Sequence, residues 1–325
     1  FEAVRQMLPK ISDPICIRRN ELSDPPGKSG KATSTEVDSP RNPADIVQNA
    51  LDWINEEEPT DRRHFLYVLA LTNRLRYPAS MWTWPFHQGE KSTATRVSRT
   101  DRWQSALEEK HVIRRKRGGF IWMHCDIRNQ LRLSIPEGHE ELINATARIH
   151  HGLAEWNQKL LIAADTPSPA FEIVYHRCQQ AVAMLKNRQV TDGNQLLAAL
   201  SDAMRALETA RSAMLSEGFS KSVCRRLQQV RDTYIRQVEL SLEASSIENE
   251  VKQPVRHRLQ LLRLTSLRLN AMVAREVGEN VTAFERYREL RVWQYVARWY
   301  PEWSHEEQVD KVRSLLKLFQ PEPAQ

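Results

Sequence analysis

The chain has 325 residues, a length that allows two or three domains, and its 41% hydrophobic and 27% charged residues are typical of globular proteins. No apolar run approaches the roughly 20 residues of a membrane-spanning helix, so we expect no membrane partner. Four cysteines without a C-x-x-C pair argue against a zinc ribbon and favour a reducing, cytoplasmic location. The net charge of +6 arises in residues 61–135, which contain fifteen Lys and Arg and six Asp and Glu, a segmental charge of +9.

Residues 1–59 are predicted to form N-terminal helices and a flexible linker. A short helix within 1–22 is followed by a polar, Ser/Thr/Pro-rich segment at about 23–43. A second helix is predicted to begin near Pro43, because proline is favoured in the first turn.

The linker contains "DPPGKSGK" (24–31), which is similar to the end of a phosphate-binding loop. Leu22 stands where that loop needs its first glycine, and Pro25 and Pro26 remove two backbone N–H donors. The Gly27-Lys28-Ser29 sequence is therefore interpreted as a solvated loop without a nucleotide.

Residues 60–136 have the element order of a winged-helix domain. A helix capped by Thr60 or Asp61 is followed by a polar loop at 87–99 and by a helix over "RWQSALEEK", which Thr100 or Asp101 caps. The stretch "HVIRRKRGGFIWMH" (111–124) contains two β-rich runs around an Arg-Gly-Gly turn and predicts a hairpin. Asp126 is predicted to cap the next helix, "IRNQLRLS".

Residues 137–325 are predicted to be almost entirely helical. Two joints combine a glycine with a polar residue that caps the next helix, Gly218 with Ser220 and Gly278 with Asn280, and one helix is expected to start after Pro254. Short joints produce antiparallel helix pairs. The fold predicted from the sequence is mainly α, a winged helix followed by a tetratricopeptide-like array of antiparallel helix pairs.

Two segments resemble the winged-helix part of the signal-transduction ATPases with numerous domains. These proteins have NB-ARC-type nucleotide-binding domains and include NOD-like receptors of plants and animals and related fungal families. Phe65-Leu66-Tyr67 with Ala70-Leu71 resembles the family's Phe-Leu-Tyr helix, and Met123-His124 with Asp126 and Arg128 resembles its Met-His-Asp motif. The sequence departs from that motif at Cys125, which separates the histidine from the aspartate.

The resemblance implies that His124 contacts a phosphate of ADP and so holds the closed, inactive state, with ADP or ATP bound by an upstream nucleotide-binding domain. It also implies a non-catalytic regulatory role in signalling, innate immunity included, with a ligand or protein partner on the helical array and homo-oligomers on activation. No cofactor or metal is expected within this chain. The alternative for His124 is that it only ends a strand and packs under Trp122.

The alternative function is nucleic-acid binding by the basic hairpin residues Arg114, Arg115, Lys116 and Arg117. Glu108 and Glu109 in the predicted recognition helix argue against it.

Further residues could suggest sites but have simpler interpretations. His150-His151 and His176 with Cys178 lack metal-ligand spacing and are interpreted as ordinary helix residues. The C-terminal aromatic residues are interpreted as packing of a terminal helix pair, with a partner-binding edge as the alternative: Trp293, Tyr295, Trp299, Tyr300 and Trp303.

Overall fold

The computed structural model describes most of the chain from residue 42 onward. The described ranges are 42–56, 59–72, 77–78, 93–116, 120–134, 140–163, 166–186, 193–215, 220–301, 303 and 305–318. The predicted helix within 1–22, nearly all of the predicted linker and the Gly27-Lys28-Ser29 sequence lie outside these ranges.

Helix α3 (Pro43–Glu56) begins at the predicted proline. Helix α4 (Pro59–Thr72) contains an uninterrupted buried run from Phe65 to Ala70. The run is apolar on every side because α4 is enclosed by neighbours, packing on α3, α6 and α7. The Phe-Leu-Tyr sequence is therefore part of the hydrophobic core.

The predicted hairpin is confirmed. Strands β2 (Ile113–Lys116) and β3 (Phe120–Met123) pair in antiparallel fashion, with Ile113 opposite Met123. A two-residue strand, β1 (Tyr77–Pro78), pairs with the other edge of β3 and gives the strand order β1-β3-β2. Helix α6 (Cys125–Leu133) follows one residue after β3.

Helix α5 (Thr93–Glu109) starts earlier than predicted, because it includes part of the expected loop at 87–99. Arg99 explains the extension. Its guanidinium bonds the Asp61 carboxylate of α4 at 2.6 Å and lies over the Trp103 ring at 4.8 Å. The bond to Asp61 fastens this end of α5 to α4, and the contact with Trp103 supports it from within α5.

The remaining described elements are all helical. They are α7 (Glu140–Ala163), α8 (Ser168–Lys186), α9 (Gly193–Thr209), α10 (Arg211–Met214), α11 (Ser220–Gln229), the π-helical η6 (Val230–Ile235), α12 (Arg236–Ala244), α13 (Asn249–Glu276), α14 (Asn280–Trp299) and α15 (His305–Leu318). The elements α11, η6 and α12 form one continuous helix, since the residues that join them have helical dihedral angles.

Two boundaries in this region correct the predictions. Helix α13 begins five residues before Pro254, which lies inside it. The missing N–H affects only the carbonyl of Glu250, an exposed residue in the first turn, so the helix tolerates the proline. Helix α14 has Glu279 as its N-cap without a side-chain hydrogen bond, and Asn280 is its first helical residue, not its cap.

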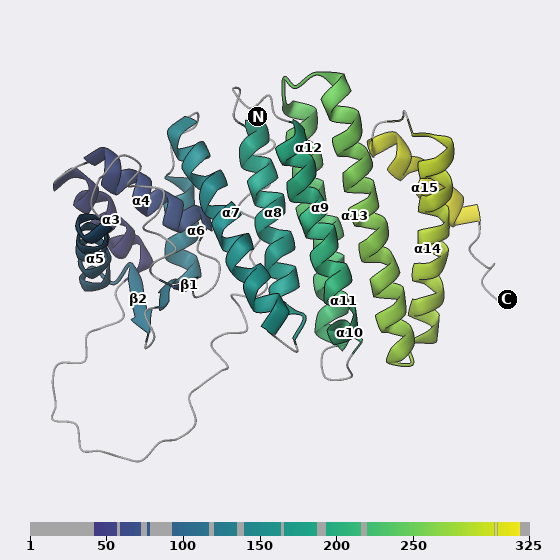
Figure 1. The fold of residues 1–325 in the computed structure, drawn as a ribbon, viewed down its shortest axis with the longest axis horizontal. Coiled ribbons are helices and arrows are strands. Elements are labelled where there is room, and N and C mark those ends of the chain that lie inside the picture. Colours follow the sequence, from purple (N-terminus) through teal and green to yellow (C-terminus); the bar gives the residue numbers. More distant parts are fainter. Residues whose placement is uncertain are drawn as a thin grey trace, which may run out of the picture.

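Figure 1 shows the long helices side by side in one elongated row, with α3 to α6 and the strands at one end and α14 and α15 at the other. Helix α8 packs on α7, α9 and α12, and α13 packs on α9, α11 and α14. The prediction of a mainly α protein is confirmed for the described residues, whereas the winged-helix and tetratricopeptide-like arrangements remain interpretations.

The buried side chains form three clusters. One extends from Ile46 in α3 through the strands to Leu153 in α7, and a second extends from Leu161 in α7 to Val273 in α13. The third joins α13, α14 and α15 around Trp293. The first cluster contains residues on both sides of the predicted domain limits at 59 and 136. The domain limits remain predictions.

Candidate functional site

The hairpin and helix α6 together place His124 at the surface. Side chains alternate along β3, so that Ile121 and Met123 are buried and Trp122 is half-buried. His124 continues this alternation in an extended conformation, and its side chain keeps 43% of its accessible surface. The ribbon predicted between 111 and 124 is thus present, and its terminal imidazole lies outside the core.

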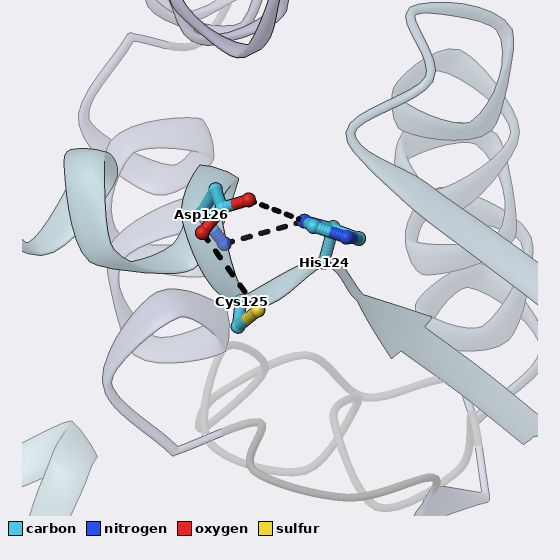
Figure 2. A group of neighbouring side chains, drawn as sticks. All are labelled: His124, Cys125 and Asp126. Carbon is cyan, nitrogen blue, oxygen red and sulfur yellow. Dashed lines mark hydrogen bonds and ion pairs between the residues drawn. The ribbon is translucent and has the colours of Figure 1, made fainter. Parts of the chain in front are cut away.

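The ring of His124 makes three contacts with two residues, and Figure 2 shows the two polar ones, both with Asp126. Its Nδ1 atom accepts the backbone N–H of Asp126 at 3.3 Å and lies 3.4 Å from the Asp126 carboxylate. The Trp122 ring meets it edge to face, with the centroids 5.7 Å apart. The predicted packing on Trp122 is therefore real, but it leaves the ring partly exposed.

The hydrogen bond from the Asp126 N–H indicates the tautomer of a neutral His124. Nδ1 accepts a hydrogen bond, so the proton of the neutral ring is on Nε2. Figure 2 shows the far end of the ring pointing away from Asp126 and α6. Among the described residues no hydrogen-bond partner for Nε2 is found. The side chain can therefore donate one outward hydrogen bond to an acceptor from another molecule.

The prediction that Asp126 caps α6 is wrong, because His124 is the N-cap. Asp126 lies in the first turn, where its exposed carboxylate complements the positive end of the helix. Arg128 is buried, and its backbone N–H donates to the His124 carbonyl at 2.9 Å to close that turn. Of the motif residues, His124 and Asp126 face solvent, whereas Met123 and Arg128 belong to the interior.

Cys125 adds a third polar side chain to this turn. A ring nitrogen of His124, the Sγ of Cys125 and a carboxylate oxygen of Asp126 lie within 4.8 Å of one another, an arrangement that could hold a metal ion. Two physical factors oppose it. A metal at Nδ1 would displace the capping hydrogen bond, and the helix N-terminus disfavours a cation. The geometry suits an anion at Nε2 better than a cation at Nδ1.

One arginine of the basic hairpin is neutralised by a carboxylate of α5. The Arg115 guanidinium bonds Glu108 of α5 at 2.6 Å and Ser105 at 2.8 Å, and this hydrogen bonding lowers the pKa of Glu108. Arg114 lies 6.0 Å from the centre of the Trp122 ring. The Lys116 side chain and Arg117 lie outside the described residues.

The histidines that lacked metal-ligand spacing in the sequence meet in the structure. His150 of α7 and His176 of α8 are buried with their Nδ1 atoms 2.8 Å apart, and burial, with Arg132 nearby, lowers the pKa of His150 to about 3. His151 bonds Arg177 at 2.7 Å. Burial also raises the pKa of the Cys178 thiol to about 12, which makes it unreactive.

The C-terminal aromatic residues divide into two groups. Trp293 is buried, and Tyr300 and Trp303 stack with their centroids 4.1 Å apart, as the packing interpretation predicts. Tyr295 and Trp299 are exposed on the outer side of α14, which that interpretation did not predict.

A cavity of about 350 Å³ lies where α12, α13 and α15 meet. Its lining includes two ion pairs, Glu239 with Arg263 at 2.6 Å and Glu243 with Arg256 at 2.9 Å. Each charge in these pairs is balanced by its partner. The pairs therefore give the cavity little preference for a charged ligand, whereas the donor at His124 favours an anion.

The comparisons provide no independent assignment. No family model, no curated protein and no solved structure matches this chain. Within the part of the chain that the structure describes, none of the helices combines the length and apolar character needed to cross a membrane.

Proposed function

We propose that this chain is the non-catalytic regulatory region of a nucleotide-switched signalling protein. In this proposal His124 donates a hydrogen bond from Nε2–H to a phosphate of ADP, which is held by a nucleotide-binding domain outside the chain. The hairpin and the surrounding helices act as a winged-helix module. The helical array serves as a tetratricopeptide-like surface for a ligand or protein partner, because stacked helices offer extended binding faces.

The outward donor on His124 is the observation that supports this role most strongly. Nδ1 is occupied by the Asp126 N–H, so Nε2 must carry the proton and point away from α6. A donor held in one orientation loses little side-chain entropy when a phosphate arrives. The sequence resemblance at Met123-His124 supplies the identity of the acceptor.

The strength of one such bond suits a switch. A hydrogen bond to a charged acceptor contributes about 1.5–3 kcal/mol. This corresponds to roughly a tenfold to hundredfold change in the balance between a closed, ADP-bound state and an open state. Loss of the bond would therefore favour the open state without unfolding the protein.

The experiment compares two substitutions in the intact protein that includes the nucleotide-binding domain. His124→Ser keeps a good N-cap for α6 but removes the long outward donor, so we expect ADP release to accelerate about tenfold or more. His124→Gln retains an amide donor of similar reach and should restore part of the retention. ADP release is measured with a fluorescent analogue after rapid mixing with unlabelled nucleotide.

Circular dichroism at increasing urea serves as the control, because His124→Ser must leave the free energy of unfolding nearly unchanged. If ADP release from the His124→Ser variant equals that of the wild type, the phosphate contact is refuted. An intact protein that binds no ADP refutes the whole proposal.

A further inference from the structure

One wall of the cavity between α12, α13 and α15 consists of hydrogen-bonding side chains without a carboxylate or a guanidinium. Gln253, His257 and Gln260 line it from α13, and their spacing of four and three residues places them on one face of that helix. No residue that the structure describes forms a hydrogen bond with Gln253 or His257. The polar atoms of these two side chains therefore remain available to a ligand.

Gln260 presents one defined atom to this cavity. The Gln308 Nε2 atom lies 2.9 Å from the Tyr300 carbonyl and 3.4 Å from the Trp303 carbonyl, and carbonyls only accept, so the Gln308 amide nitrogen faces them. The Oε1 of Gln308 then faces α13 and accepts the Gln260 Nε2–H at 3.1 Å. The Gln260 Oε1 has no partner among the described residues, and although Gln260 is only 9% exposed, this oxygen is not sealed in the interior. It can accept an N–H from a ligand.

The carboxylates and guanidiniums that line the cavity cancel in charge. Glu239 and Arg263 form a buried ion pair at 2.6 Å. Arg256 donates to both carboxylate oxygens of Glu243, at 3.0 and 2.9 Å. The charge of Arg236 also reaches Glu239 from one turn away on α12, but Arg236 does not line the cavity. A ligand with a single charge would meet a charge of its own sign in each pair and would lose its hydration, so the cavity favours an uncharged molecule.

Apolar and aromatic side chains complete the lining. They are Leu242 of α12, Pro254 of α13, and Pro301 and Trp303 of the segment between α14 and α15. The Trp303 ring stacks on Tyr300, with the centroids 4.1 Å apart and the planes at 33°. One face of the indole is thus covered, and a flat ring placed on its other face would extend the stack, an arrangement that aromatic rings favour.

We propose that the cavity binds a small uncharged molecule that combines an aromatic ring with an amide group. The amide N–H donates to Oε1 of Gln260, and the amide oxygen accepts from Gln253 or His257. The ring lies against Trp303. The volume of about 350 Å³ is at the lower end of the roughly 300–1,000 Å³ of small-molecule pockets. This inference rests on the part of the proposed function that assigns ligand binding to the helical array, and it does not involve His124.

Three compounds with the same naphthalene ring and different end groups test the charge preference. At neutral pH naphthylacetamide is uncharged, naphthylacetate is an anion and naphthylethylamine is a cation. Each compound is titrated with the 325-residue chain, and binding is followed by ligand-observed NMR. We expect saturable binding of naphthylacetamide at one site, at least about tenfold tighter than that of either charged compound.

Variants of the more exposed ion pair should change this preference in opposite directions. Glu243→Gln leaves Arg256 without its carboxylate and should strengthen naphthylacetate binding about fivefold, whereas Arg256→Gln should do the same for naphthylethylamine. Both side chains are partly exposed, so neither change should affect folding. Glu108→Gln is the matched control, because it breaks an ion pair with Arg115 at the opposite end of the row in Figure 1; it should leave all three affinities unchanged.

Further variants locate the ligand within the cavity. Gln260→Met keeps the length of the side chain but removes Oε1, and Trp303→Leu removes the ring; each should weaken naphthylacetamide binding at least about tenfold. Both residues also contribute to packing, so urea unfolding of each variant shows whether the fold is retained. Gln253→Met combined with His257→Leu changes only side chains outside the core and should weaken naphthylacetamide binding about threefold or more.

Three results would overturn the proposal. The first is that naphthylacetamide does not bind, and the second is that a charged compound binds the wild-type chain equally well or more tightly. The third is that the combined change of Gln253 and His257, together with any folded variant of Gln260 or Trp303, leaves the affinity unchanged, which would place the ligand elsewhere. ADP retention by the His124 variants is a separate measurement, so either proposal can fail alone.

Discussion

The hydrogen bond between His150 and His176 requires both rings to share one proton between their Nδ1 atoms. One ring donates and the other accepts, so a second proton at this contact would place two donors 2.8 Å apart. The ring of Tyr175 packs edge to face against both histidines, with its centroid 6.0 Å from that of His150 and 5.0 Å from that of His176. A proton on the accepting Nδ1 would therefore break the bond between α7 and α8, and burial disfavours a charged His150.

This pair predicts loss of stability in mild acid. The pKa of His150 is about 3 in the folded protein and about 6.5 in an unfolded chain, so the unfolded state takes up the proton first as the pH falls. Stability from this group is fully present above about pH 6.5. It decreases by about 1.4 kcal/mol for each pH unit below that value, until the pH approaches 3.

Urea unfolding between pH 7 and pH 4.5 measures this effect, with His150→Gln as the matched variant. Glutamine keeps a hydrogen-bonding side chain but cannot titrate, so the difference in unfolding free energy between wild type and variant should shrink as the pH falls. If the unfolding free energies of the two proteins change with pH in parallel, His150 takes up its proton as readily in the folded state as in the unfolded state, which contradicts the prediction.

At the scale of elements, the turn between α13 and α14 is built on one glycine. Gly278 has a φ of 77° and follows Val277, the C-cap of α13. The N–H of Gly278 donates to Arg275 at 3.0 Å and the N–H of Glu279 donates to Ala274 at 2.9 Å, the two hydrogen bonds of a Schellman motif. The glycine predicted from the sequence as a helix end is confirmed here.

Gly278→Ala should destabilise the protein through its backbone alone. A Cβ at this position would meet no atom within 4 Å, so the only cost is that of a left-handed conformation, about 1–2 kcal/mol. Gly278→Asn should lose less, because asparagine tolerates this conformation. Urea denaturation of both variants measures the difference, and equal stability of the alanine variant and the wild type would contradict the turn geometry.

The same elements show what a local pattern can and cannot reveal. The hairpin was predictable because its alternation and its Arg-Gly-Gly turn are local signals. The cap of α6 was not, because imidazole is outside the usual set of N-cap side chains and the pattern favoured Asp126. Pro254 gave a false helix start, since a proline near the first turn is tolerated where the affected carbonyl faces solvent.

At the scale of the whole molecule, the missed features depend on the register between helices. His150 and His176 are 26 residues apart and meet only because α7 and α8 pack antiparallel at that level. The sequence assigned the C-terminal aromatic residues to the packing of a terminal helix pair but could not show that Tyr295 and Trp299 remain exposed on α14. The presence of His124 at a strand end was predictable, but its tautomer depended on the cap.

The distribution of charge over the molecule bears on nucleic-acid binding, the alternative function. The +9 excess of residues 61–135 would favour DNA if its cations were available to phosphates. Asp61 holds Arg99 at 2.6 Å, and Glu108 holds Arg115 at the same distance. The hydrogen bond from Arg115 lowers the pKa of Glu108, so the carboxylate remains ionised and continues to hold Arg115 at neutral pH.

We therefore expect the chain to bind a duplex DNA probe only with the weak affinity of non-specific contacts, Kd about 10⁻⁴–10⁻⁶ M at physiological salt. Glu108→Gln should release Arg115 to a phosphate and steepen the slope of log K against log salt by about 0.9, the value for one added contact. Fluorescence anisotropy over a series of salt concentrations measures both quantities. Wild-type binding much tighter than this range, with a salt slope that corresponds to several phosphate contacts, would favour the nucleic-acid function. It would mean that Asp61 and Glu108 do not keep their arginines from binding phosphates.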